Sequence, residues 1–173
     1  ESNLIENNSF LEGTTSDRNI LLDAEDYWTV INNNTFTTIG AGHDGIVDNS
    51  DLITISNNTF SDISFIGIEI AGDSNDIYNN DFSGIMDLGI DLMSGSLNHI
   101  YNNSITNMTT AGIYILDSSN IVESNNITDG TAGTDEGIFL QFANSNIIRY
   151  NTITGIDIYG IDLDESDLNN ITD

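Results

Sequence analysis

A phrase of six residues recurs along the chain, and it constrains the fold more than any other feature of the sequence. In each copy an aliphatic residue is followed three residues later by Asn and five residues later by Phe or Ile, and successive copies start 22 to 26 residues apart. A fixed period of this length is typical of solenoids, in which each repeat packs only against its neighbours. The copies read Ile5-Asn8-Phe10, Ile31-Asn34-Phe36, Ile55-Asn58-Phe60, Ile77-Asn80-Phe82, Ile100-Asn103-Ile105, Val122-Asn125-Ile127 and Ile148-Asn151-Ile153.

A second phrase, Gly-Ile-x-aliphatic, follows later in each copy, as in Gly67-Ile68-Glu69-Ile70 and Gly89-Ile90-Asp91-Leu92. Apolar residues two apart indicate strands with alternate side chains buried. Each copy therefore predicts two or three short strands joined by corners rich in Asn, Ser, Asp and Gly. The predicted fold is an all-β, right-handed parallel β-helix of about seven to eight coils, stacked about 4.8 Å apart. A leucine-rich repeat has a similar period, but it requires Leu where this chain has Ile and Asn.

The recurring Asn is expected to turn inward at a corner and to bond backbone groups that no strand satisfies. This structural ladder comprises Asn8, Asn34, Asn58, Asn80, Asn103, Asn125 and Asn151.

The segment from Ser74 to Phe82, followed by Gly89 to Leu92, resembles the parallel β-helix repeat of NosD-type and pectate-lyase-like proteins. The resemblance extends over essentially the whole chain. It implies the fold, but it leaves the function open among polysaccharide lyases, hydrolases and epimerases, surface proteins and a copper-maturation family.

The charge of the chain excludes several classes of protein. It has 28 Asp and Glu residues, two Arg and no Lys, for a net charge of −26. A nucleic-acid binder needs a basic patch, and anionic lipid would be repelled. No apolar run is long enough for membrane insertion, and the absence of Cys excludes thiol chemistry. We expect one domain over residues 1–173, as a fragment or subunit of a larger extracellular protein or assembly.

The repeat also predicts which side chains meet on adjacent coils. Counting from the Gly-Ile phrase places Arg18 beside Asp44 and Asp17 beside His43, at a corner where three coils carry insertions. An acid, an imidazole and a guanidinium together could act on a sugar by general acid/base catalysis, although paired surface charges are the simpler explanation. If the chain is an enzyme, these four residues are its candidate catalytic groups. The same counting pairs Arg149 with Glu123 and His99 with Asp76.

Two carboxylates are expected to stack directly, because Glu69 and Asp91 occupy the same outward position on adjacent coils. Like charges in this arrangement repel unless they are screened or bridged. Calcium prefers oxygen ligands and could bridge the pair, so Ca²⁺ is the candidate cofactor. A solvated acidic face is the alternative. Stacked aromatic pairs are also expected, Tyr78 with Tyr101 and Tyr114 with Phe139.

Asn-x-Ser/Thr sequons supply candidate glycosylation sites, and several of them directly precede a ladder Asn, which would place glycans along one edge of the rod. The sequons begin at Asn7, Asn33, Asn57, Asn102, Asn107, Asn126 and Asn170.

These features together favour a structural module at the cell surface or outside the cell, in a surface-layer, adhesin or filament-forming protein. Its exterior would be acidic, with the sequons as candidate sites for glycans. Its partners would be copies of itself stacked end to end, or the rest of a longer chain. The alternative is a β-helix that binds or processes polysaccharide. A role in copper maturation ranks third, because the chain has only two His and three Met residues.

Overall fold

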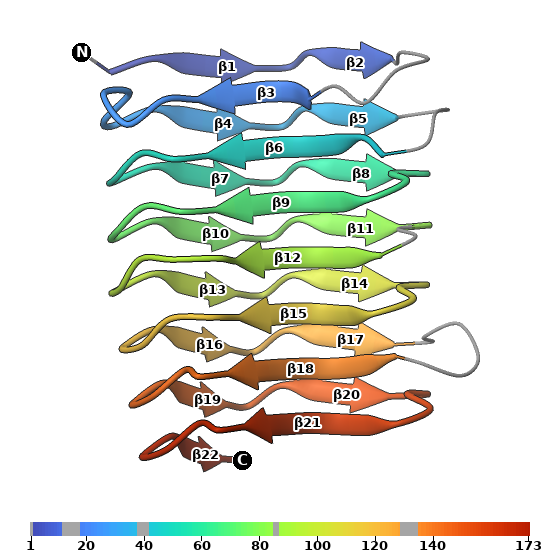
Figure 1. Cartoon of the computed structure of the whole chain (residues 1–173). Helices are drawn as coiled ribbons and strands as arrows, with labels where there is room; N and C mark the ends of the chain where they lie inside the picture. Colours follow the sequence, from blue (N-terminus) through green and yellow to red (C-terminus); the bar gives the residue numbers. More distant parts are fainter. Residues whose placement is uncertain (1, 12–17, 38–41, 85–86, 129–134) are drawn as a thin grey trace.

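A computed structural model describes residues 2–11, 18–37, 42–84, 87–128 and 135–173. Within these ranges every regular element is a strand, and the strands form three parallel sheets that wind into a solenoid (Figure 1). No helix in the described part of the chain is long and apolar enough to cross a membrane. The fold is the predicted β-helix, and the two ends of the chain lie at opposite ends of the rod (Figure 1).

Each coil contributes one strand to each sheet. Sheet A contains β1 (Leu4–Glu6), β4 (Val30–Asn32), β7 (Thr54–Ser56), β10 (Asp76–Tyr78), β13 (His99–Tyr101), β16 (Ile121–Glu123), β19 (Ile147–Arg149) and β22 (Asn170–Thr172). Sheet B contains β2 (Ser9–Leu11), β5 (Thr35–Thr37), β8 (Thr59–Ser61), β11 (Asp81–Ser83), β14 (Ser104–Thr106), β17 (Asn126–Thr128) and β20 (Thr152–Thr154). Sheet C contains β3 (Arg18–Leu22), β6 (Asp44–Asp48), β9 (Ile66–Ile70), β12 (Leu88–Leu92), β15 (Ala111–Ile115), β18 (Glu136–Gln141) and β21 (Tyr159–Asp164).

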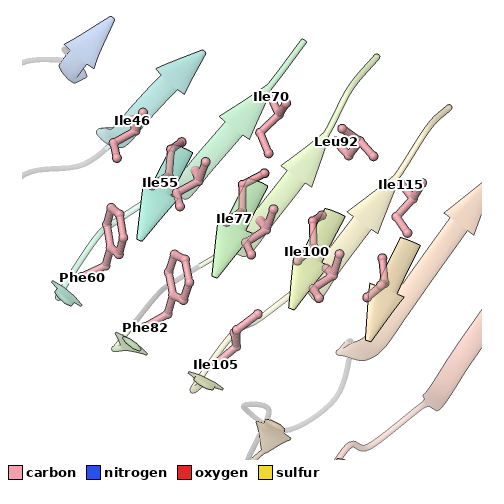
Figure 2. Close-up of a cluster of buried hydrophobic side chains, with 14 of the residues drawn as sticks. Ile46, Ile55, Phe60, Ile70, Ile77, Phe82, Leu92, Ile100, Ile105 and Ile115 are labelled. Carbon is pink, nitrogen blue, oxygen red and sulfur yellow. The ribbon is translucent and has the colours of Figure 1, made fainter. Parts of the chain in front are cut away.

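The core is made of apolar side chains at equivalent positions, stacked coil upon coil (Figure 2). The middle residue of each short strand points inward, because side chains alternate along a strand. In sheet B these residues begin with Phe10, Phe36, Phe60 and Phe82, whose rings stack with centroids 4.6–4.8 Å apart and planes within 4–6° of each other. Ile105 continues the column in the next coil. Burying such a column supplies the main stabilising free energy of the rod.

The corner between sheets A and B is held by the ladder Asn side chains. The Asn80 N–H donates to Asn103 Oδ1 (3.0 Å), and Asn103 Nδ2 donates to the Ile77 carbonyl (3.0 Å) and to Asn125 Oδ1 (3.0 Å). The same bonds repeat along the column, and the amides of the inner coils are almost fully buried. Each amide therefore satisfies a backbone N–H and a carbonyl of the preceding coil, at a corner where the strands have ended, and is itself bonded to the amide of the next coil.

A second Asn column, which was not predicted from the sequence, lies at the corner between sheets C and A. There Asn98 Oδ1 accepts the Asn75 N–H (2.8 Å), and Asn98 Nδ2 donates to the Gly72 carbonyl (2.9 Å). The repeat contained the signal for this column, because an Asn precedes strand A at a spacing of 22 to 26 residues. Its members are Asn75, Asn98, Asn120, Asn146 and Asn169.

The Gly of the Gly-Ile phrase is required by the close approach of adjacent coils. A Cβ atom on Gly89 would lie 2.5 Å from the Gly112 carbonyl oxygen and 2.7 Å from Ile105 Cγ2. Only a residue without a side chain fits there. The Gly of this phrase therefore marks the place near the start of each sheet C strand where the backbone passes close to the core column of sheet B.

Candidate functional site

The predicted acid/base corner is only partly assembled by the described residues. Arg18 and Asp44 are register partners, and Arg18 Nε lies 3.8 Å from Asp44 Oδ2. Burial raises the pKa of Asp44, against the lowering effects of the Ile66 backbone N–H and the Arg18 charge. Half of the Arg18 side chain remains exposed. The predicted pairing of Arg18 with Asp44 is confirmed, while Asp17 lies outside the described residues.

The imidazole of this corner is not displayed to a ligand. His43 is 2 % exposed, and its backbone N–H donates to Ser64 Oγ (3.2 Å). A general acid or base must come within hydrogen-bond distance of the substrate proton that it transfers. The described part of this corner therefore combines a buried imidazole with an exposed guanidinium, and a catalytic role for Asp17, Arg18, His43 and Asp44 stays a prediction.

The predicted carboxylate stack lies on the outer face of sheet C, where Glu69 and Asp91 are register partners. Asp91 is only 6 % exposed, and its Oδ1 has no hydrogen-bond partner. Burial raises the pKa of Asp91 to about 7, with further contributions from the charges of Glu69, Asp87 and Asp44. The pKa of Glu69 is raised as well, mainly by burial. Both raised pKa values favour the uncharged forms, so either proton uptake or a bridging cation would relieve the repulsion in this pair.

No group of three or more His, Cys, Asp or Glu side chains converges on a metal position in the part of the chain that the structure describes. No pocket is found there either.

A buried carboxyl that sequence reasoning missed lies in the core itself. Asp48 occupies the inward position that Leu22 and Ile70 hold on the adjacent coils, and it is fully buried. Its Oδ1 accepts hydrogen bonds from the Ser50 hydroxyl (2.6 Å) and backbone N–H (2.9 Å), while Oδ2 has no partner. Burial raises the pKa of Asp48 to about 6. The signal was an Asp at an aliphatic position of the second phrase.

A network of charged side chains spans four coils on the outer face of sheet A. Glu123 Oε1 lies 2.8 Å from His99 Nε2, and Glu123 Oε2 accepts from Arg149 Nε (2.5 Å). The hydrogen bond from Arg149 is the main cause that lowers the pKa of Glu123; burial acts against it, and the hydrogen bond from His99 adds a smaller lowering effect. Asp76 Oδ1 lies 3.9 Å from His99 Nδ1. The two predicted pairs are confirmed, and Glu123 joins them into one network.

The predicted aromatic pairs are also present. Tyr78 and Tyr101 stack with ring centroids 4.8 Å apart, and the His99 ring lies 4.2 Å from the Tyr101 ring. Tyr114 and Phe139 stack at 4.9 Å on sheet C. They pack against a small outer cluster of Ile66, Leu88 and Ala111. Both pairs join neighbouring coils, so side chains at equivalent positions stack on the surface as they do in the core.

All the sequon Asn residues are exposed. Four of them lie at the corner between sheets A and B with positive φ, namely Asn7, Asn33, Asn57 and Asn102. Their amides partly bond to one another, as when Asn33 Nδ2 donates to Asn7 Oδ1 (2.5 Å). The row of outward Asn is thus a geometric fact, whereas the attachment of glycans to it stays a prediction.

Comparison with known proteins agrees with this geometry. Residues 18–173 match the family model described as a right handed beta helix region. Searches of curated proteins and of solved structures found no match. The family match extends over most of the 173 residues, and the three parallel sheets have the architecture that it describes. The chain therefore belongs to the right-handed parallel β-helix family.

Proposed function

We propose that this chain is a structural β-solenoid module of a cell-surface or extracellular protein, such as a surface-layer, adhesin or filament-forming protein. The observation that carries the proposal is the unbroken set of ladders. The described coils repeat the same backbone pairing and the same inward core positions, the amide column between sheets A and B runs from Asn8 to Asn151, and the second amide column runs from Asn75 to Asn169. Such a rod gives length and rigidity, with flat sides rather than a concave active site.

The surface chemistry supports an exterior location. A net charge of −26 without any Lys keeps the rod hydrated and prevents binding to nucleic acid and to anionic membranes. Exposed sequons in a row suit glycan attachment outside the cell. Since adjacent coils are only about 4.8 Å apart, two glycans would collide on neighbouring coils. We therefore expect Asn33 to stay free whenever Asn7 or Asn57 is modified.

The partners that we propose for the rod are a second copy of this chain, or further coils of a longer chain, stacked on it end to end. Such stacking would pair strand edges and continue the core columns from one unit to the next.

Immunogold labelling of intact cells of the source organism tests the location. Antibodies against the folded rod should label unpermeabilised cells or the surrounding matrix, and labelling that needs permeabilisation would overturn the proposal. Mass spectrometry of the native protein would then read sequon occupancy.

Calcium binding at Glu69 and Asp91 remains part of this proposal, and calorimetry with Ca²⁺ tests it. Electron cryomicroscopy with Ca²⁺ and after chelation tests the stacking. The expected result is binding that Asp91→Asn abolishes, together with end-to-end rods that lose order in chelator. A calorimetric titration without a heat change would exclude calcium binding at this pair. Monomers both in Ca²⁺ and after chelation would exclude end-to-end stacking.

A further inference from the structure

The outer face of sheet B differs from the rest of this acidic surface. Its seven strands present two outward side chains each, which gives fourteen positions in two parallel rows. Eleven of the fourteen carry a hydroxyl: Ser9, Thr35, Thr37, Thr59, Ser61, Ser83, Ser104, Thr106, Thr128, Thr152 and Thr154. Among the fourteen outward positions of these described strands, only Asp81 carries a carboxylate.

The hydroxyl rows are held on a flat and evenly spaced support. Directly beneath them, the Phe column repeats at 4.6–4.8 Å with only 4–6° between successive ring planes. Large sheets normally twist, and flat ones are stabilised by side-chain ladders such as this. The amide column at the preceding corner fixes the start of each strand. The rows therefore keep their register from coil to coil.

The side chains themselves are short and stiff. Threonine is restricted at χ1, and some hydroxyls of the second row are further fixed by bonds, such as Thr37 Oγ1 to Ser61 Oγ (2.9 Å) and Thr106 Oγ1 to the Phe82 carbonyl (3.2 Å). The first row is more open, with Thr35, Thr59 and Thr152 exposed. The two rows are about 6.6 Å apart, since two residues of a parallel strand span that distance.

A rigid flat face with a two-dimensional repeat suits a surface that repeats in the same way. A small soluble ligand needs a concave site, which this face does not offer. A mineral salt would require charged side chains, and those are almost excluded here. Ice presents rows of oxygen atoms on its prism faces at a similar pair of spacings, and it is recognised by hydroxyl and methyl groups that order water without charge.

We propose that the outer face of sheet B binds ice, with its two hydroxyl rows aligned to the oxygen rows of a prism face. The hydroxyls hold water molecules in ice-like positions, and the threonine methyl groups fill the spaces between them. This function is independent of the cell-surface role, so either can fail without the other. It also accounts for the phase of four sequons, because Ser9, Thr35, Thr59 and Ser104 are both hydroxyl-row residues and the third residues of those sequons.

The chain produced in a host without N-glycosylation is the material for the test. Slow freezing around a cold finger measures partition into ice, and nanolitre osmometry measures thermal hysteresis. We expect the protein to enter the ice and to arrest crystal growth over a measurable temperature gap. A protein that stays in the liquid and shows no hysteresis would overturn the proposal.

Two substitutions localise the effect. Thr59→Tyr places a bulky ring in the middle of the exposed row and should reduce both readouts several-fold. Thr54→Tyr is the matched control on sheet A, where Tyr78 and Tyr101 already face outward, and it should change neither readout. Equal losses from both variants, with folding verified by circular dichroism, would place the activity elsewhere and refute this face.

A third variant should increase the activity. Asp81→Thr removes the one carboxylate from the rows and restores the hydroxyl pattern. A larger thermal hysteresis than that of the unmodified chain is expected. A decrease, with the fold intact, would contradict the requirement for a neutral hydroxyl array.

Discussion

The buried amide side chains and the buried carboxyl side chains of this solenoid differ in how fully their hydrogen-bonding groups are paired. The ladder amides, such as Asn80 and Asn103, donate to both neighbouring coils and accept from the preceding one, and the pattern repeats along the rod. The buried carboxyls Asp48 and Asp91 each keep one oxygen without a hydrogen-bond partner. An amide carries donors and an acceptor, whereas a carboxylate only accepts, so only the amide can form a continuous column.

The comparison separates burial that stabilises the rod from burial that costs stability. Removing a satisfied amide leaves the groups to which it was hydrogen-bonded without a partner. Each buried group left unpaired lowers the free energy of unfolding by about 1–3 kcal/mol. Removing an unsatisfied carboxyl relieves a desolvation penalty instead. The following changes test this contrast, in order of expected effect.

The largest effect is expected from Asn103→Ala. It deprives Asn80 of an acceptor and the Ile77 carbonyl of a donor, inside the rod, so the free energy of unfolding should fall by about 3–5 kcal/mol. Urea unfolding followed by circular dichroism measures it. Asn102→Gly is the matched control, because Asn102 is exposed with a φ of 55°, which Gly adopts freely. Equal losses from both variants would show that the column adds no stability.

The second effect has the opposite sign. Asp48→Leu puts an aliphatic residue where the neighbouring coils have Leu22 and Ile70. Since burial raises the pKa of Asp48 from 3.8 to about 6, ionising it in the folded protein costs about 3 kcal/mol at neutral pH. Part of that gain is offset by losing the Ser50 bonds, so we expect a net increase of about 2 kcal/mol in the free energy of unfolding.

The reciprocal substitution Ile70→Asp serves as the control for Asp48→Leu, because it introduces a carboxyl at the register-equivalent position, where the residue two places later is Gly72 and offers no hydroxyl. It should destabilise the rod at neutral pH. A less stable Asp48→Leu protein would mean that the Ser50 bonds outweigh the burial cost.

The third effect is a pH dependence. The folded-state pKa values of Asp48 and Asp91 are raised to about 6 and about 7, so the folded rod binds protons more tightly than the unfolded chain. Their contribution is fully present below the ordinary value of 3.8 and is lost as pH rises through the raised values. The free energy of unfolding should therefore fall between about pH 5 and about pH 8.

Asp91→Asn should remove part of that slope, and Asp48→Leu together with Asp91→Asn most of it. Measurement in high salt suppresses the general repulsion of the acidic surface. A free energy of unfolding that rises from about pH 5 to about pH 8 would contradict this assignment.

The smallest effect is expected from Glu123→Gln on the surface of sheet A. The network with His99 and Arg149 is partly exposed, so the free energy of unfolding should fall by less than about 1 kcal/mol, and less still in high salt. Glu6→Gln, in the same outward row at the end of the rod, is the control. A loss as large as that of Asn103→Ala would erase the distinction between core amides and surface charges.

The sequence predicted the fold and most of the register, because a repeat of 22 to 26 residues fixes which side chains stack. Arg18 beside Asp44, Glu123 beside Arg149 and Tyr78 beside Tyr101 follow from counting alone. Counting could not predict how deeply Asp91 is buried, because exposure depends on how neighbouring side chains fill the space. It also gave no diagonal contacts, and so Glu123 was not expected beside His99.

The regular stacking of coils also means that the number of repeats sets the length of the rod. Nearly every contact joins residues one repeat apart, so the loss or gain of one whole repeat would leave every other pairing in phase and change the length by about 4.8 Å. The Phe column favours one place for the duplication of a repeat that contains Phe. Only among the first four coils would the new ring stack on another ring on both sides. Lineages that extend this protein should therefore do so in discrete steps, and the sites of duplication should be legible in where rings give way to aliphatic side chains.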